Sequence, residues 1–225
     1  MSNPTRSRRV ALGLAAAGSA LVLAACSGAD EPAPTEAAEA ADPIEETTEA
    51  AETDTADFNQ GPIPAAAPEL DETELPPEPA TDAPLGDRIA WEALEQVSLF
   101  AKVTDPDATS ECPAIAGEEG ESATCTVTFL GEPFEYTIDI ESSGILINYQ
   151  ATLHDGPLIR EVVEDALRSS ENTEYVLCDM DADLVRGETD TDAPFTCQSL
   201  DEASGTVSEH TLSISMYGAF SFFPA

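Results

Sequence analysis

Five cysteines carry the most specific chemistry in this sequence: Cys26 near the N-terminus, then Cys112, Cys125, Cys178 and Cys197. In an exported chain the last four predict disulfides, and four cysteines permit three pairings. We favour Cys112–Cys125 with Cys178–Cys197, because these pairs close short loops. A redox pair or a metal site is the weaker interpretation, since no Cys-x-x-Cys occurs and both histidines lie far from the cysteines in sequence.

Two further sets of side chains could take part in chemistry. Asp179-x-Asp181-x-Asp183 begins like a calcium loop, but the sixth position is Leu184 where an EF-hand requires glycine. A solvated acidic loop is the simpler interpretation, so we expect no metal and no cofactor. His154 and His210 are the only histidines. A catalytic triad would need a nucleophile and an acid to converge on one of them, so we expect no catalytic residues and no enzyme.

The first 25 residues have the pattern of a signal peptide. A positive start with three arginines is followed by an apolar run, Val10–Leu23, which is shorter than the roughly 20 residues that span a bilayer. The run ends in Leu23-Ala24-Ala25-Cys26, which resembles the bacterial lipobox. That resemblance implies cleavage before Cys26, acylation of its thiol and anchoring at the outer face of the cytoplasmic membrane. The alternative is an ordinary cysteine near a secretory cleavage site.

The net charge limits the partners of this chain. The 225 residues carry 45 acidic and eight basic side chains, a formal charge of −37. Such a chain repels the phosphate backbones of nucleic acids, so nucleic-acid binding is excluded as an expected function.

Residues 26–83 have the composition of a spacer. The segment is rich in alanine, proline and acidic residues, contains no lysine or arginine, and its few apolar residues follow no period. Too little apolar surface is present to offset the entropy of ordering the chain. We therefore predict a disordered acidic tether.

The remaining chain contains a candidate duplication. Asp82-Ala83-Pro84-Leu85 is echoed by Asp155-Gly156-Pro157-Leu158, and each is followed by a helical pattern, a cysteine, a loop, a second cysteine and strands. We expect repeats over 84–153 and 154–225, each with a helix opened by its proline. The favoured disulfide pairing also respects this repeat.

Alternating residues predict the strands of both repeats, which are expected at the ranges 125–129, 134–140, 145–149, 197–200, 207–215 and 219–223. The predicted fold class is α+β: two tandem repeats, each one helix packed on a three- to four-stranded antiparallel sheet with a local disulfide.

One stretch of the first repeat resembles a known family. Glu111-Cys112-Pro113, the loop to Cys125-Thr126-Val127-Thr128, and the strand Phe134–Ile138 are similar to a small domain of actinobacterial lipoproteins that has no assigned function. The resemblance covers about 40 residues and implies a disulfide-bonded envelope domain without catalytic residues. The second repeat is similar only in outline, because Asp179 follows Cys178 where the family has proline.

Together these patterns predict a lipid-anchored envelope lipoprotein that presents a non-enzymatic binding module to an envelope protein or ligand. The alternative is an inhibitor of an extracellular enzyme, because tandem helix-on-sheet units with short-range disulfides are similar in plan to secreted β-lactamase inhibitory proteins. A concave apolar face shared by the repeats would favour binding, and a protruding loop such as 179–196 would favour inhibition. A converging histidine, acid and hydroxyl would favour catalysis.

Overall fold

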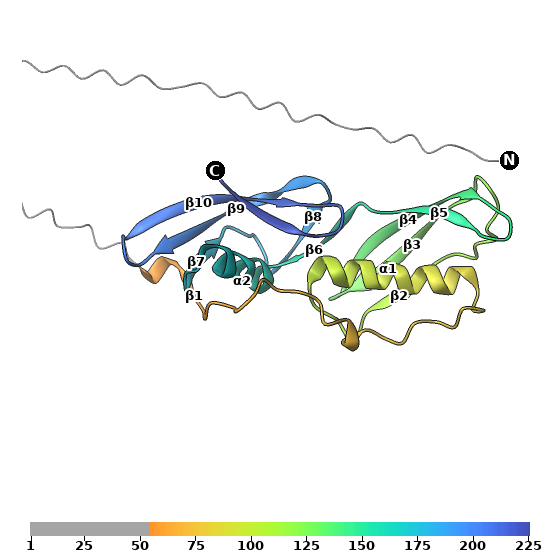
Figure 1. Cartoon of the computed structure of the whole chain (residues 1–225), viewed down its shortest axis with the longest axis horizontal. Coiled ribbons are helices and arrows are strands. Elements are labelled where there is room, and N and C mark those ends of the chain that lie inside the picture. Colours follow the sequence, from red (N-terminus) through yellow and green to blue (C-terminus); the bar gives the residue numbers. More distant parts are fainter. Residues whose placement is uncertain (1–54) are drawn as a thin grey trace, which may run out of the picture. The chain divides into compact units, whose positions relative to one another are not determined.

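The computed structural model describes residues 55–225. The predicted signal peptide, the lipidation site Cys26 and the tether as far as residue 54 lie outside the described residues. The described part belongs to one compact unit and is α+β, as predicted, with two α-helices among mostly antiparallel strands (Figure 1).

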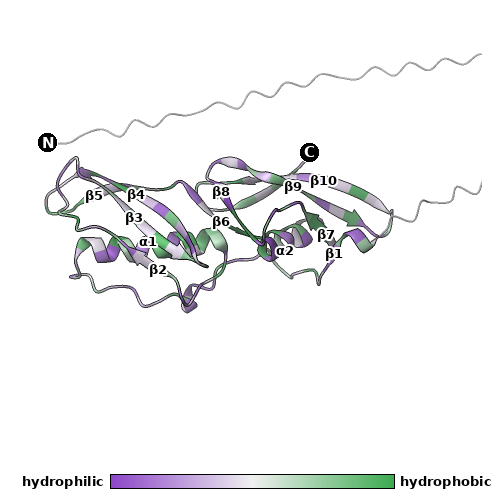
Figure 2. Ribbon diagram, turned by 180° about the vertical axis from the view of Figure 1, so that it is seen from behind, coloured by the Kyte–Doolittle hydropathy of each residue, from purple (hydrophilic) through white to green (hydrophobic). Residues whose placement is uncertain are grey.

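The first half is one helix against a four-stranded sheet. Helix α1 (Leu85–Ala101) covers strands in the order β2 (Thr109–Glu111), β3 (Ser122–Phe129), β4 (Glu132–Ser142) and β5 (Asn148–Leu153), all antiparallel. Inward and outward residues alternate along β3 and β4, which Figure 2 shows as a change of hydropathy from residue to residue. The inward residues meet the apolar face of α1 in one core.

Local signals explain these elements. Pro84 precedes α1 as its N-cap, Asp87 lies in its first turn, and the helix ends where Lys102 adopts a left-handed conformation with φ 63°. The β3–β4 hairpin turns at Leu130 and Gly131, both with positive φ, as a two-residue turn of the primed type requires. Pro133 follows this turn and is part of β4.

The second half contains a larger sheet and an additional ribbon. Helix α2 (Arg160–Glu171) packs on a five-stranded sheet in the order β1 (Asn59–Gln60), β7 (Tyr175–Cys178), β9 (Thr191–Asp201), β10 (Thr206–Ile214) and β11 (Phe220–Pro224). The ribbon pairs β6 (Asp155–Ile159) with β8 (Leu184–Glu188). The described strand set therefore exceeds the predicted three or four in this half, and the duplication itself stays a prediction.

The prediction that Pro157 opens a helix is wrong. Asp155–Ile159 forms strand β6, and α2 begins at Arg160. The strand packs on the first half: Gly156 lies directly against the ring of Phe100 in α1, and Leu158 is fully buried. Burial of this segment between the two halves overrides its helical pattern, and β6 pairs only with β8, so Pro157 lies in an edge strand, where proline is tolerated.

The predicted disorder of the tether is corrected for its second part. Residues 55–83, here called the strap, run along the helices in an ordered path that contains two short 3-10 turns, Thr55–Asp57 and Glu72–Glu74. Strand β1 adds to the edge of β7, and Trp91 Nε1 donates to the carbonyl of Pro76 at 2.9 Å. The strap has no hydrophobic core of its own. It is ordered because it pairs with β7 and forms hydrogen bonds with the folded part.

Candidate functional site

Both predicted disulfides are confirmed. Cys112 follows β2 and is bonded to Cys125 in β3, and Cys178 of β7 is bonded to Cys197, its direct partner in β9. Each bridge ties neighbouring strands of one sheet. Cys125, Cys178 and Cys197 are buried, which is typical of structural bridges rather than redox pairs.

The acidic loop after Cys178 surrounds Arg160, a positively charged side chain of the same protein. The guanidinium of Arg160 donates to the carbonyls of Cys178 at 2.8 Å and Met180 at 2.6 Å, and contacts the carboxylate of Asp183 at 3.2 Å. Strand β8 occupies 184–188, so the range 179–196 is not the protruding loop that an inhibitor would use. Within residues 55–225 no three histidine, cysteine or acidic side chains are placed to hold a metal ion.

The two histidines lie in different surroundings. His154 is exposed between β5 and β6, whereas His210 is buried in β10. His210 Nε2 and the hydroxyl of Ser199 in β9 are hydrogen-bonded at 2.8 Å. Among residues 55–225 no carboxylate is hydrogen-bonded to the His210 ring, so the pair lacks the orienting acid of a triad. The alternation of residues along β9 and β10 could have predicted that these two side chains lie on one face of the sheet. It could not have predicted the register that brings them within hydrogen-bond distance.

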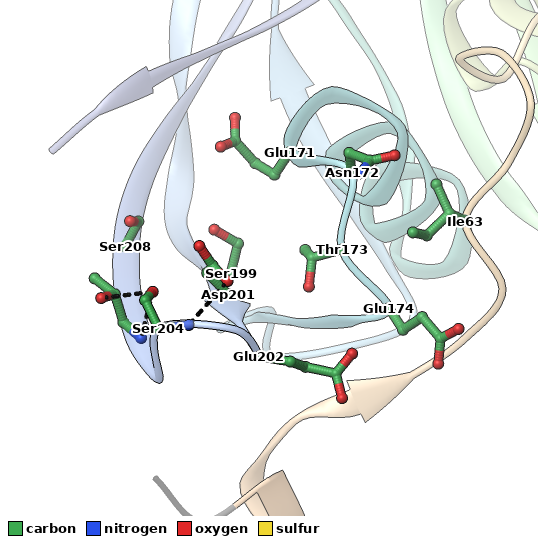
Figure 3. A pocket seen from close by; sticks show the side chains of 11 residues that line it. Ile63, Glu171, Asn172, Thr173, Glu174, Ser199, Asp201, Glu202, Ser204 and Ser208 are labelled. Carbon is green, nitrogen blue, oxygen red and sulfur yellow. Dashed lines mark hydrogen bonds between the residues drawn. The ribbon is translucent and has the colours of Figure 1, made fainter. Parts of the chain in front are cut away.

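Ser199 lines a polar cleft between the end of α2 and the β9–β10 hairpin (Figure 3). The cleft measures about 580 Å³, and its walls carry carboxylates and hydroxyls from Glu171, Thr173, Glu174, Ser199, Asp201, Glu202, Ser204, Thr206 and Ser208. Thr173 is held in place because its hydroxyl donates to the carbonyl of Leu200. Hydrogen bonds from the backbone N–H groups of Ala203 and Ser204 hold the pKa of Asp201 below its usual range.

A second cavity, here called the inter-half groove, lies where the two halves and the strap meet. It measures about 750 Å³. Both helices, the C-terminal strand and the strap line it, through Ala67, Pro68, Glu69, Leu70, Glu72, Leu99, Lys102, Ala166, Ser169, Ser170 and residues 219–223. Its walls are more apolar than those of the polar cleft, mainly through Leu70, Leu99 and the aromatic rings of β11. A volume in this range is typical of small-molecule sites.

Lys102 is the only lysine of the chain and lies in the wall of this groove. Its ammonium donates to the carbonyls of Leu99 at 3.0 Å and Gly218 at 2.7 Å, and lies 5.3 Å from the centre of the Phe220 ring. Partial burial lowers the pKa of Lys102, and the negative charge of Glu69 opposes that shift. Sequence reasoning missed this residue, because nothing in its neighbours predicts the cavity.

A third surface feature is an apolar loop between β4 and β5. Ile145 is fully exposed and Leu146 is 76% exposed, with Ile147 beside them. Exposed neighbouring aliphatic residues of this kind mark interaction surfaces.

Comparison with protein-family models, curated proteins and solved structures finds no match for this chain. Neither helix of the described residues 55–225 is long and apolar enough to cross a membrane.

Proposed function

We propose that this protein is a lipid-anchored lipoprotein of the cell envelope that presents a non-enzymatic binding module. Cys26, at the end of the lipobox-like stretch, would carry the lipid, and the acidic segment before residue 55 would connect it to the module. Two structural disulfides agree with an oxidising compartment outside the cytoplasm.

The observation that carries the proposal is the inter-half groove. The C-terminal part of α1 supplies Leu99 and Lys102, α2 supplies Ala166 and Ser170, and β11 supplies its aromatic rings. Because neither half alone would form this concave, largely apolar surface, it is a feature of the assembled module. A concave surface shared by both halves supports a binding function.

A catalytic function has less support. The Ser199–His210 pair is the nearest approach to a catalytic arrangement among the described residues, and it has no carboxylate on the second ring nitrogen. Both side chains are about 5% exposed, so a substrate would have little access to the hydroxyl. We therefore assign the pair to the packing of the sheet.

Two blocking variants test the binding proposal. Ser170→Trp places an indole in the inter-half groove from an exposed helix position, and Ser208→Trp does the same in the polar cleft. The full chain is immobilised and offered an envelope extract. We expect bound material to be lost with Ser170→Trp and retained with Ser208→Trp. Equal retention by both variants and the parent would overturn the groove as the binding site.

The anchor is tested separately. Cells that express the full chain are fed an alkyne-labelled palmitate, and the protein is examined for label and for membrane association. We expect both to be present in the parent and absent in Cys26→Ser. Label that persists in Cys26→Ser would contradict the assignment of the lipid to this residue.

The alternative function, inhibition of an extracellular enzyme, is favoured by the exposed loop at Ile145 and Leu146, since inhibitors insert such loops into enzyme clefts. The protein would then slow hydrolysis of a chromogenic substrate by a secreted β-lactamase, and the double variant Ile145→Ser/Leu146→Ser would not. Absence of inhibition at micromolar protein removes this alternative for that class of enzyme.

A further inference from the structure

We propose that the inter-half groove binds a long-chain monocarboxylate, with its apolar chain along the groove and its carboxylate at the ammonium of Lys102. This inference rests on the proposed binding function and names the chemical class of its ligand.

The apolar part of the site is formed by side chains that are incompletely covered. Leu70, Phe220 and Phe222 are half-buried, and Phe223 is 54% exposed at the end of β11. Covering such surface with an alkyl chain removes apolar area from water, which favours binding. A chain of aliphatic carbons fits this apolar part of the lining, whereas Glu69, Glu72, Ser169, Ser170 and Ser221 make the remaining walls polar.

The positive charge of the site comes from one cation, Lys102. Arg160, Arg168 and Arg186 each form an ion pair with at least one carboxylate. Lys102 forms no ion pair within residues 55–225, although the charge of Glu69 opposes the lowering of its pKa by burial, and its ammonium donates to two backbone carbonyls. An ammonium has three N–H donors, so one remains for a ligand.

The immediate surroundings of Lys102 favour a single negative charge on the ligand. Glu69 and Glu72 also line the groove, and they would repel a headgroup with two charges more strongly than one with a single charge. The site offers a point charge rather than the bidentate fork of a guanidinium. A singly charged carboxylate is compatible with this arrangement.

The test uses the full chain with Cys26→Ser, so that neither lipid nor detergent competes for the groove. Dodecanoate is titrated by calorimetry, with dodecanol, acetate and dodecyltrimethylammonium as probes that lack the charge, lack the chain or reverse the charge. We expect dodecanoate to bind most tightly and acetate and the cationic amphiphile to show no binding.

Two variants test whether the charge of Lys102 contributes to dodecanoate binding. Lys102→Gln keeps hydrogen-bond donors but removes the charge, and it should weaken dodecanoate binding about tenfold or more. Arg88→Gln removes a cation from an exposed position on the same helix and should leave the affinity unchanged. Circular dichroism before each titration verifies that both variants are folded.

A second measurement does not depend on the heat of binding. Because Lys102 is the only lysine, an amine-reactive ester followed by peptide mass spectrometry reports on this site alone among side chains. Dodecanoate should protect Lys102 from acylation, and dodecanol should protect it less.

The outcomes separate the inference from the proposed function. If dodecanol binds as tightly as dodecanoate, or if Lys102→Gln retains full affinity, the monocarboxylate assignment fails while a binding groove remains. If no amphiphile binds, the assignment also fails. In that case the Ser170→Trp capture experiment decides alone whether the groove binds another class of ligand.

Discussion

Arg168 in α2 and Asn59 in the strap are hydrogen-bonded although 109 positions separate them in the chain. Arg168 Nη2 donates to the carbonyl of Asn59 at 3.1 Å, and the side-chain amide of Asn59 donates to Glu164 at 2.8 Å. Glu164 and Arg168 themselves form an ion pair at 3.4 Å and are about 5% exposed. One residue of the strap thus connects to both members of a buried pair.

This relationship predicts a large cost for Arg168→Met. The substitution leaves Glu164 buried without its cation and releases the strap, so we expect a loss of about 3–5 kcal/mol in the free energy of unfolding. Urea unfolding followed by circular dichroism measures it, and hydrogen exchange should rise over residues 55–61. Asp183→Asn is the control: it removes an exposed partner of Arg160 and should cost less than about 1 kcal/mol. Similar costs for the two variants would contradict the role of the buried pair.

The two disulfides should contribute comparably to stability. They close loops of 13 and 19 residues. Each should raise the free energy of unfolding by about 3 kcal/mol, because it restricts the unfolded chain. The double variants Cys112→Ser/Cys125→Ser and Cys178→Ser/Cys197→Ser should each lower the urea midpoint, and Cys26→Ser should not. Peptide mapping without reductant checks the pairing. A fragment that joins Cys112 to Cys178 or Cys197 would exclude it.

Gly156→Ala tests the contact between the two halves. A Cβ at this position would lie 2.4 Å from ring atoms of Phe100, which is fully buried. Such a contact forces the strand or the buried ring to shift, so we expect a loss of about 1–3 kcal/mol. Combining Gly156→Ala with Phe100→Leu should recover part of this loss in stability. The recovery is measured as a coupling energy in a double-mutant cycle. Strict additivity of the two changes would show that the halves are not in contact here.

The alkaline limit of stability should depend on Tyr149. Tyr136 and Tyr149 both donate to the carboxylate of Glu92 in α1. Burial and this hydrogen bond raise the pKa of Tyr149 to about 12, from an ordinary value of 10.0. The unfolded chain therefore loses the proton first, and the stabilising contribution of Tyr149 is complete below pH 10 and lost as the pH rises to about 12.

Urea midpoints at several pH values check this effect. Tyr149→Phe should reduce the fall in midpoint between pH 10 and pH 12, while Tyr217→Phe, at an exposed position, should not. An unchanged alkaline slope in Tyr149→Phe would exclude the effect.

Ser199 should be inert toward a serine-directed reagent. Its hydroxyl is buried and its histidine partner lacks an orienting carboxylate, so diisopropyl fluorophosphate should leave the peptide that contains Ser199 unmodified. Mass spectrometry of the treated full chain is the measurement. Stoichiometric labelling that disappears in His210→Gln would indicate a catalytic serine.

The elements that local patterns could predict are those with internal signals. Helix α1 has a proline at its start and a regular apolar face, and β3 and β4 alternate, so their positions followed from the sequence. The cysteine pairing followed from short loops and the proposed repeat. Strand β5 begins at Asn148, later than predicted, because Ile145 and Leu146 are exposed loop residues rather than strand residues.

Long-range contacts decided the remaining elements. Strand β6 depends on Phe100, which lies 56 positions before Gly156 in the chain, and the strap depends on Glu164 and Arg168. Neither contact leaves a periodic pattern in the segment that it orders. The inter-half groove was unpredictable for the same reason, since its lining comes from four separate segments.

Strand β11 forms the outer edge of the five-stranded sheet, and it ends in Phe222-Phe223-Pro224. Proline has no N–H to offer a further strand, and its ring obstructs the close approach that pairing requires. A second molecule can therefore touch the aromatic side chains at this edge but cannot extend the ladder past Pro224. Pro224 thus removes one backbone donor from the end of this edge, while the aromatic side chains of β11 stay accessible to smaller molecules.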